Sequence, residues 1–348
     1  MSGALRLVLA DDLTGTLEVG AILKQAGRRV RIGIGEVPAV EEDEVAVIDC
    51  QTRRLGAEAA MGRYADILRA AARPAEELYV KVDSTLRGNV AAALQAVLMQ
   101  YPEAGITLCP AYPSQGRKVV GGQVLVHGEA LRARSSADEC AEPVGSGVVS
   151  ELVSPLGRRV RAYDAETEEE LRAMWTDGVV MAGSAGLLAA RFPRQAGAGV
   201  ARGALAGRRW LVACGSMNPA TQRQLAESPW AVLRYPATQE ELAERLETDR
   251  GVVVATPAER CEEDMTGWLA AMAQGSGATG LIVFGGDTAA SILAVHGIRS
   301  LEAAGEILPG VPCSWVQLRG AETPLLTKAG GFGAPGLLSS LISEINKA

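Results

Sequence analysis

Short runs of β-forming residues alternate with helix-like segments along almost the whole chain, and this alternation constrains the fold most. In the first half the strand-like runs span residues 5–10, 30–34, 45–49, 77–82 and 106–110, and helix-like patterns cover 15–26, 56–72 and 89–100. Strands separated by single helices form parallel sheets, because each helix returns the chain to the same edge of the sheet. The sequence therefore predicts an α/β fold with doubly wound, mainly parallel sheets.

Residues 193–207 interrupt this alternation, since they are rich in Gly and Ala and have no apolar periodicity. A new strand-like run begins at Trp210, and the second half alternates again, with a helix expected over 259–273, strand-like runs over 313–318 and 325–328, and a terminal helix after Pro335. We expect two domains, 1–205 and 206–348, with an active-site cleft between them. The irregular segment 111–164 is expected to contain a hairpin over 119–126.

Composition excludes several classes of partner. The chain of 348 residues has a formal net charge of −7 and no Lys/Arg run that could neutralise several phosphates, which argues against nucleic acid. No apolar stretch approaches the ~18 residues of a membrane span. Six cysteines without C-x-x-C spacing and only two histidines offer no zinc site. We expect a cytoplasmic protein with reduced thiols, with a homodimer as one assembly to test.

The motif ADDLTG, residues 10–15, lies where the first strand runs into its helix. Carboxylates at the carboxyl end of a parallel strand lie where α/β proteins bind ligands, and Asp11 or Asp12 could accept a hydroxyl proton there. Alternatively, Asp12 simply caps the helix. The motif alone leaves both interpretations open.

A second cluster, KVDSTLRGN at residues 81–89, follows another buried strand. Arg87 could clamp an anion, Lys81 could add a point charge, and the Ser84 hydroxyl could donate a hydrogen bond beside the carboxylate of Asp83. The alternative is a capped helix start with one surface ion pair. Two further arginines belong to the same half: Arg53 after the 45–49 strand, and Arg117 in the proline-containing loop CPAYPSQGRK.

The second half carries small-residue turns instead of charges. Gly285 and Gly286 lie between an apolar strand and a helix whose first turn contains Asp287 and Thr288. Glycines next to free helix amides form an anion cradle of the kind that nucleotides use, although tight packing between a strand and a helix also selects such glycines. Two similar turns occur, one at CGS with Ser216 and one at KAGGFG with Gly330 and Gly331.

Taken in order, ADDLTG, QTRR, KVDSTLRGN, CPAYPSQGR, CGSMNPATQRQ, GGDTAASIL and TKAGGFG resemble the four-carbon acid sugar kinase family. The resemblance implies an N-terminal domain that binds an acid sugar, a C-terminal domain that binds ATP, and phosphorylation of a sugar-acid hydroxyl such as that of threonate or erythronate. On the acid-sugar side it implies Asp11, Asp12, Arg53, Asp83, Ser84, Arg87 and Arg117. On the nucleotide side it implies Ser216, Gly285, Gly286, Asp287, Thr288, Gly330 and Gly331.

The expected chemistry is direct transfer of the γ-phosphoryl group from Mg²⁺-ATP, which needs positioning and charge neutralisation. We expect Arg87 and Arg53, helped by Lys81, to hold the substrate carboxylate. Asp12 is the first candidate to orient or deprotonate the acceptor hydroxyl, and Asp287 is its rival, because it resembles the GxGD aspartate of ribokinase-like kinases. Two departures favour the alternative of a noncatalytic sensor that binds a sugar acid or a nucleotide. They are Glu18, where the family usually has Asp, and stretches shorter than the family's usual length between Leu131 and Tyr163 and between Tyr235 and Gly251.

Overall fold

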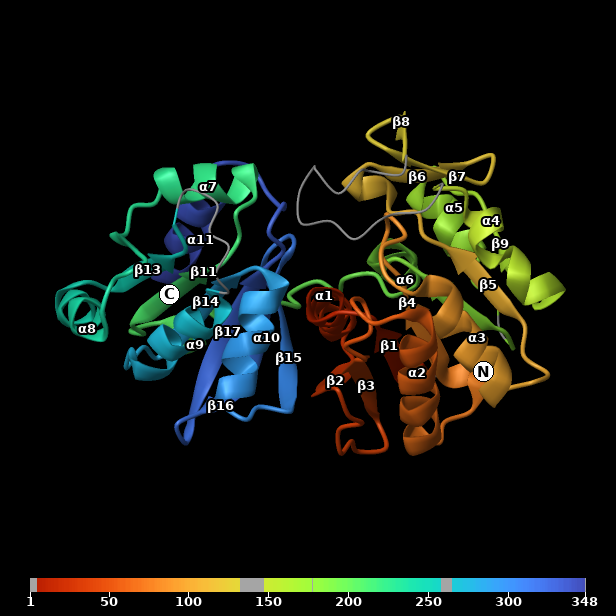
Figure 1. The fold of residues 1–348 in the computed structure, drawn as a ribbon, viewed down its shortest axis with the longest axis horizontal. Helices are drawn as coiled ribbons and strands as arrows, with labels where there is room; N and C mark the ends of the chain where they lie inside the picture. Colours follow the sequence, from red (N-terminus) through yellow and green to blue (C-terminus); the bar gives the residue numbers. More distant parts are fainter. Residues whose placement is uncertain (1–4, 132–146, 177, 258–264, 348) are drawn as a thin grey trace. The chain divides into compact units, whose positions relative to one another are not determined.

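The structure is a computed structural model that describes residues 5–131, 147–176, 178–257 and 265–347. The chain divides into two compact units, Met1–Ala196 and Gly197–Ala348 (Figure 1). The division falls inside the Gly/Ala-rich stretch 193–207 from which a boundary was predicted. We describe each unit by itself.

The first unit is built on a seven-stranded sheet in which every pairing is parallel. Its strand order is β2-β3-β1-β4-β10-β5-β9. The strands are β1 (Leu7–Ala10), β2 (Arg29–Ile34), β3 (Glu44–Asp49), β4 (Leu78–Lys81), β5 (Ile106–Cys109), β9 (Val160–Ala162) and β10 (Val180–Gly183). All residues of β1, β3, β4, β5 and β10 are buried, as expected for a sheet covered on both faces.

Every connection in this sheet except residues 35–43, between β2 and β3, is made through helices. They are α1 (Leu13–Gln25), α2 (Ala57–Ala71), α3 (Val90–Gln100), α4 (Val149–Val153), α5 (Glu168–Ala173) and α6 (Ala185–Arg191). Helix α2 packs against α3, and α1 packs against α6. The expected strands and helices of this unit are confirmed.

The chain changes direction across the sheet at β1. It winds from β1 through β2 to β3 on one side, and β4 then pairs with the other side of β1. In the register, Ala10 lies opposite both Asp49 and Lys81. The loops that follow β1, β3 and β4 therefore leave the same edge of the sheet at a topological switch point, the place where α/β folds bind ligands.

A small antiparallel sheet interrupts the first unit and contains the expected hairpin. Its strands are β6 (Arg117–Val120), β7 (Gln123–Val126) and β8 (Glu129–Ala130). Both turn residues, Gly121 and Gly122, have positive φ, as a two-residue hairpin turn requires. The carboxylate of Asp164 accepts hydrogen bonds from both glycine amides at 2.6 and 2.8 Å.

The second unit has a mixed sheet with the order β12-β13-β11-β14-β17-β16-β15. Five strands are parallel, and β16 is antiparallel to both β17 and β15. The strands are β11 (Trp210–Cys214), β12 (Val232–Arg234), β13 (Gly251–Ala255), β14 (Gly280–Phe284), β15 (Ser300–Leu308), β16 (Val311–Leu318) and β17 (Ala321–Lys328). The helices are α7 (Pro219–Ala226), α8 (Gln239–Thr248), α9 (Thr266–Gly275), α10 (Gly286–Val295) and α11 (Leu337–Asn346).

This unit repeats the winding of the first. From β11 the chain passes through β12 to β13 on one side, and β14 then pairs with the other side of β11. Cys214 lies opposite Ala255 and Phe284 in the register. The turns after β11 and β14 therefore share a switch point of their own.

Two expectations for this unit need correction. The short strand-like runs over 313–318 and 325–328 belong to longer strands, and β15 was not anticipated. Its Ala-rich and Gly-containing sequence has low β-propensity, and the strand forms by antiparallel pairing with β16 across two register shifts. The helix expected over 259–273 is α9, Thr266–Gly275, and the residues 258–264 lie outside the described part of the chain.

The architecture is α/β with mainly parallel sheets, as the alternation predicted. Among the described residues, no helix has the length and apolar character needed to cross a membrane. Cys50, Cys109, Cys214 and Cys313 are free, buried thiols.

Candidate functional site

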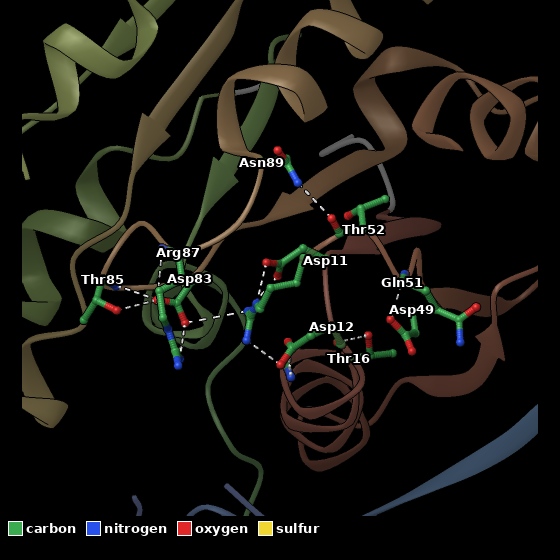
Figure 2. A network of polar contacts seen from close by, with 12 residues as sticks. Asp11, Asp12, Thr16, Asp49, Gln51, Thr52, Asp83, Thr85, Arg87 and Asn89 are labelled. Carbon is green, nitrogen blue, oxygen red and sulfur yellow. Dashed lines mark hydrogen bonds and ion pairs between the residues drawn. The ribbon is translucent and has the colours of Figure 1, made fainter. Parts of the chain in front are cut away.

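Asp11 and Asp12 follow β1 directly and begin the charged cluster of the first unit (Figure 2). Asp12 is the N-cap of α1, because its Oδ1 accepts a hydrogen bond from the amide of Gly15 at 2.9 Å. The capping interpretation of ADDLTG is thus correct as geometry. It leaves Oδ2 of Asp12 for a second interaction.

Arg53 ties the two aspartates together. Its Nε and Nη2 donate to Asp11 at 2.8 and 2.9 Å, and its Nη1 donates to Oδ2 of Asp12 at 2.5 Å. The backbone amides of Thr52 and Arg53 also donate to the carbonyl oxygen of Asp11, so the β3 loop is held against the β1 loop. Arg53 is therefore engaged on all three nitrogens.

Asp83 and Arg87 form the third part of the cluster, in the loop between β4 and α3. Nε and Nη2 of Arg87 donate to the two carboxylate oxygens of Asp83 at 3.1 and 2.8 Å. The amide and hydroxyl of Thr85 also donate to Asp83, and Nη2 of Arg53 lies 3.7 Å from it. The side chain of Arg87 remains 43% exposed, whereas that of Arg53 is only 14% exposed.

Burial and neighbouring charges shift the pKa values of Asp11 and Asp83 in opposite directions. Burial raises the pKa of Asp11, aided by the charge of Asp12 and opposed by Arg53. Burial also acts on Asp83, but the guanidinium of Arg87, with Arg53 and Lys81, holds its pKa well below its usual range. Asp83 is consequently a fixed anion.

Lys81 is the last residue of β4, and its side chain is buried. Its Nζ and Oδ1 of Asp12 both lie next to Gly15, since a Cβ built on that glycine would be 3.0 Å from Nζ and 2.9 Å from Oδ1. A Cβ on Gly88, whose φ is +80°, would lie 2.6 Å from Oδ2 of Asp11. The glycines of ADDLTG and STLRGN therefore make room for the charged side chains, which explains their place in both motifs.

The remaining residues expected on the acid-sugar side behave differently. Ser84 lies in the same turn as Asp83, with a half-buried side chain. Arg117 lies in β6, where its Nη1 donates to the carbonyl oxygen of Gln115 and its buried Nε has no partner among the described residues. No hydrogen bond or ion pair of the described chain links Arg117 to the cluster of Asp11, Arg53 and Asp83.

Asp49, the last residue of β3, was not among the site residues predicted from the sequence. Burial raises its pKa to about 7, and the charges of Asp12 and Asp11 add to this effect. The signal was present, since Asp49 ends a strand at the same sheet edge as Asp11. Two residues near the cluster, Gln51 and Leu86, have left-handed backbones with φ of 56° and 60°.

The glycine turns of the second unit converge on Ser216. The Oγ of Ser216 lies 2.6 Å from a Cβ built on Gly330, and its amide lies 3.9 Å from one built on Gly285. A Cβ on Gly215 would lie 2.2 Å from Oγ1 of Thr288, which belongs to the first turn of α10. Gly331 adjoins Asn218 at 3.1 Å by the same measure. Gly286 and Asp287 begin α10, so the residues expected on the nucleotide side gather around the ends of β11, β14 and β17.

Two family models match separate parts of the chain. A family model described as a sugar-binding N-terminal domain matches residues 6–190, and one described as a nucleotide-binding C-terminal domain matches residues 228–338. The chain belongs to the four-carbon acid sugar kinase family. Its charged cluster thus lies within the sugar-binding match, and Gly285 and Gly330 lie within the nucleotide-binding match.

Members of this family resemble the chain over nearly its whole length. A D-threonate kinase of Bordetella bronchiseptica is 28% identical over 97% of this chain and 96% of that protein, and a 3-oxo-tetronate kinase of Cupriavidus necator is 26% identical over 97% and 96%. Among solved structures, a Salmonella typhimurium LT2 protein described as a proposed tRNA synthase has a TM-score of 0.75 at 23% identity, covering 97% of this chain and 98% of that one. At this identity the structural likeness shows the fold alone.

Proposed function

We propose that this member of the family is an ATP-dependent kinase that phosphorylates a hydroxyl of a four-carbon sugar acid, with D-threonate as the first substrate to test. The single observation that carries the proposal is the cluster of Asp11, Asp12, Arg53, Asp83 and Arg87 at the switch point of the domain matched as sugar-binding. Such a cluster offers acceptors for hydroxyl groups and donors for a carboxylate within one site.

The contacts refine the roles expected for the arginines. Arg53 is occupied by Asp11 and Asp12, so we assign it to holding these two carboxylates in position. Arg87 keeps its Nη1 outside its contacts with Asp83 and is the more exposed, so we assign the substrate carboxylate to Arg87 together with Lys81. This division follows from where donors remain available.

In the reaction we propose, the acceptor hydroxyl attacks the γ-phosphorus, the bond to the bridging oxygen of ADP breaks, and a carboxylate takes the hydroxyl proton. Asp12 is our first assignment for that carboxylate, because it follows β1 at the switch point of the domain matched as sugar-binding. Asp287 at the start of α10 is the rival.

Magnesium fits this site as an ion held mainly by nucleotide phosphates. The described residues contain no cluster of three or more acidic, Cys or His side chains that would hold a metal by themselves. One carboxylate with substrate phosphates is a usual way for proteins to bind Mg²⁺, and we assign that role to Asp287 in the first turn of α10. Bound there, the ion would neutralise charge on the phosphates. The free, buried thiols suit the reducing cytoplasm, where we propose that the enzyme works.

The test is an ADP-release assay with Mg²⁺-ATP and a panel of the threonates, the erythronates and 3-oxo-tetronate. We expect turnover with at least one acid and the highest kcat/KM with D-threonate. If no acid is turned over although the acids or ATP raise Tm, the chain is a noncatalytic sensor. If another acid is preferred, the family assignment stands and the substrate changes.

A further inference from the structure

In the turn after β17, residues 329–334, most carbonyl oxygens accept hydrogen bonds from two side chains. Nζ of Lys328 donates to the carbonyl oxygens of Ala329, Gly330 and Phe332 at 2.9, 3.1 and 3.0 Å. Nε2 of Gln224, from α7, contacts the carbonyl oxygens of Phe332, Gly333 and Ala334 at 3.1, 3.0 and 3.0 Å. Five of the six carbonyls are thus directed at two buried side chains.

This arrangement fixes the direction of the amides. In a planar trans peptide the N–H points opposite to the preceding C=O. The amides of Gly330, Gly331, Gly333 and Ala334 therefore point away from Lys328 and Gln224, and none of them has an acceptor among the described residues. These amides form two successive pairs, Gly330–Gly331 and Gly333–Ala334, because the amide of Phe332 donates to the carbonyl oxygen of Ala329. Successive N–H groups of this kind bind anions as nests, and Gly330 lies against Ser216.

Lys328 adds a charge behind this nest. Its side chain is only 1% exposed, lies 4.7 Å from the ring centre of Phe284, and donates to Oγ1 of Thr221 at 3.1 Å. No carboxylate in the described part of the chain forms an ion pair with it. Carbonyl dipoles satisfy its hydrogens but leave its positive charge uncompensated, and this charge favours an anion on the amide side of the turn.

We propose that Lys328 is a positioning residue for the nucleotide phosphates: with Gln224 it holds the turn so that its amides face the phosphates, and its buried charge strengthens that site. The inference rests on the proposed function, because it presupposes that the second unit binds ATP. Neither Lys328 nor Gln224 needs to touch the nucleotide.

The first experiment measures ADP binding by calorimetry and the two KM values separately. Lys328→Met should raise the Kd for ADP and the KM for ATP at least tenfold, with the KM for the acid changed less than twofold. Lys328→Arg, which keeps the charge, should recover part of the ADP affinity. Lys347→Met is the control, because that lysine is 55% exposed and paired with Glu344.

The second experiment needs no variant and decides the question even if Lys328→Met does not fold. Burial lowers the pKa of Lys328 to about 8, so raising the pH from 7 to 9 should remove its charge and weaken ADP binding to the wild-type protein. The neighbouring charged and titratable groups are Arg234 and the Cys214 thiol, and burial raises the pKa of that thiol to about 11, above this range. Lys328→Arg should lose this pH dependence.

The outcomes separate the two claims. If wild-type protein binds neither ADP nor ATP, the proposed function fails. If it binds ADP with a Kd that is constant from pH 7 to 9, or if folded Lys328→Met binds as tightly as wild type, the kinase assignment survives and the role of Lys328 is wrong. If Lys328→Met lowers Tm and raises both KM values by the same factor, Lys328 contributes to stability alone.

Discussion

The two units share the same winding of strands, but charged residues follow the strands of the first unit and small residues follow those of the second. In both, a first strand is flanked by the third and fourth parallel strands, so two loops meet at a switch point. After β1 and β4 those loops carry Asp11, Asp12, Asp83 and Arg87, whereas after β11 and β14 they carry Gly215, Ser216 and two more glycines. We therefore expect the winding to set where a ligand binds, and the few residues after each strand to select which ligand binds.

Glycine serves the two switch points differently. In the first unit, Gly15 and Gly88 leave space that the side-chain atoms of Asp12, Lys81 and Asp11 occupy. In the second, Gly215, Gly330 and Gly331 leave space for uncharged side-chain atoms of Thr288, Ser216 and Asn218. We therefore expect a sugar acid to be recognised by side-chain charges and a triphosphate by main-chain amides.

The largest expected effect tests which of the two units supplies the general base. We expect Asp12→Asn to lower kcat by about 10² to 10⁴-fold with the KM for ATP almost unchanged, because a well-placed general base contributes that much. Asparagine still caps α1, so the fold should persist. Steady-state kinetics at saturating ATP measure the effect.

Near-normal turnover in Asp12→Asn would remove Asp12 from the chemistry. Asp287→Asn is the companion variant. If it alone loses kcat, the base comes from the second unit.

Paired glycine variants test whether each switch point serves its own substrate. Gly88→Ala should lower the free energy of unfolding by about 2 kcal/mol, from its left-handed backbone and the contact with Asp11, and should raise the KM for the acid. Gly330→Ala should raise the KM for ATP instead, because its Cβ would displace Ser216. Urea unfolding and the two KM values are the measurements.

Gly121→Ala is the matched control for Gly88, because its φ is also positive, at +57°, but nothing lies within 4 Å of the added Cβ. We expect it to cost only about 1 kcal/mol and to leave both KM values unchanged. Equal KM changes in Gly88→Ala and Gly330→Ala would mean that the two sites are not separate.

Arg87→Ala tests the assignment of the acid to the first unit. We expect the KM for the sugar acid to rise about tenfold, since a charged hydrogen bond is lost, while Asp83 keeps its bonds from Thr85. Arg69→Ala, at an exposed arginine of α2, is the control. A rise in the KM for ATP alone would reverse the placement of the two sites.

The smallest effect concerns Asp49, whose counterpart in the register of the second unit is the uncharged Ala255. Its pKa of about 7 exceeds the ordinary value of 3.8, so the folded protein holds a proton that the unfolded chain loses between about pH 4 and 7. This contribution to stability is complete below pH 4 and is lost as the pH rises to 7, at up to ~1.4 kcal/mol per pH unit.

Asp49→Asn stays neutral, so its unfolding free energy relative to wild type should increase from pH 5 to pH 8. Urea unfolding at both values measures the difference. A difference that does not change with pH would show that Asp49 is ionised throughout.

Much of the fold followed from the alternation of strands and helices, because parallel strands buried on both faces leave continuous apolar runs such as residues 45–49. The antiparallel β15 did not, since residues Ala303, Ala304 and Gly305 favour a strand only once β16 pairs with them. The rule that parallel strands end at one edge also predicted that the loops of Asp11, Arg53 and Asp83 would meet.

The partners within the site could not be predicted in the same way. Whether Arg53 faces a substrate or Asp11 depends on side-chain directions that three loops set together. Gln224 holds the turn after β17 from a helix far away in the sequence, so no local pattern links them. Asp49 had a visible position but needed the burial of β3 to become unusual.

The left-handed backbones of Gln51 and Leu86 have a consequence for how this enzyme can change. Each lies in a loop that delivers an arginine, and a non-glycine residue in that conformation costs of order 1 kcal/mol or more. Because the side chain of Gln51 is exposed, replacing Gln51 by glycine would relieve the strain of this left-handed backbone. In a selection for thermostable variants of this protein, Gln51→Gly should appear early, because it changes no charged side chain.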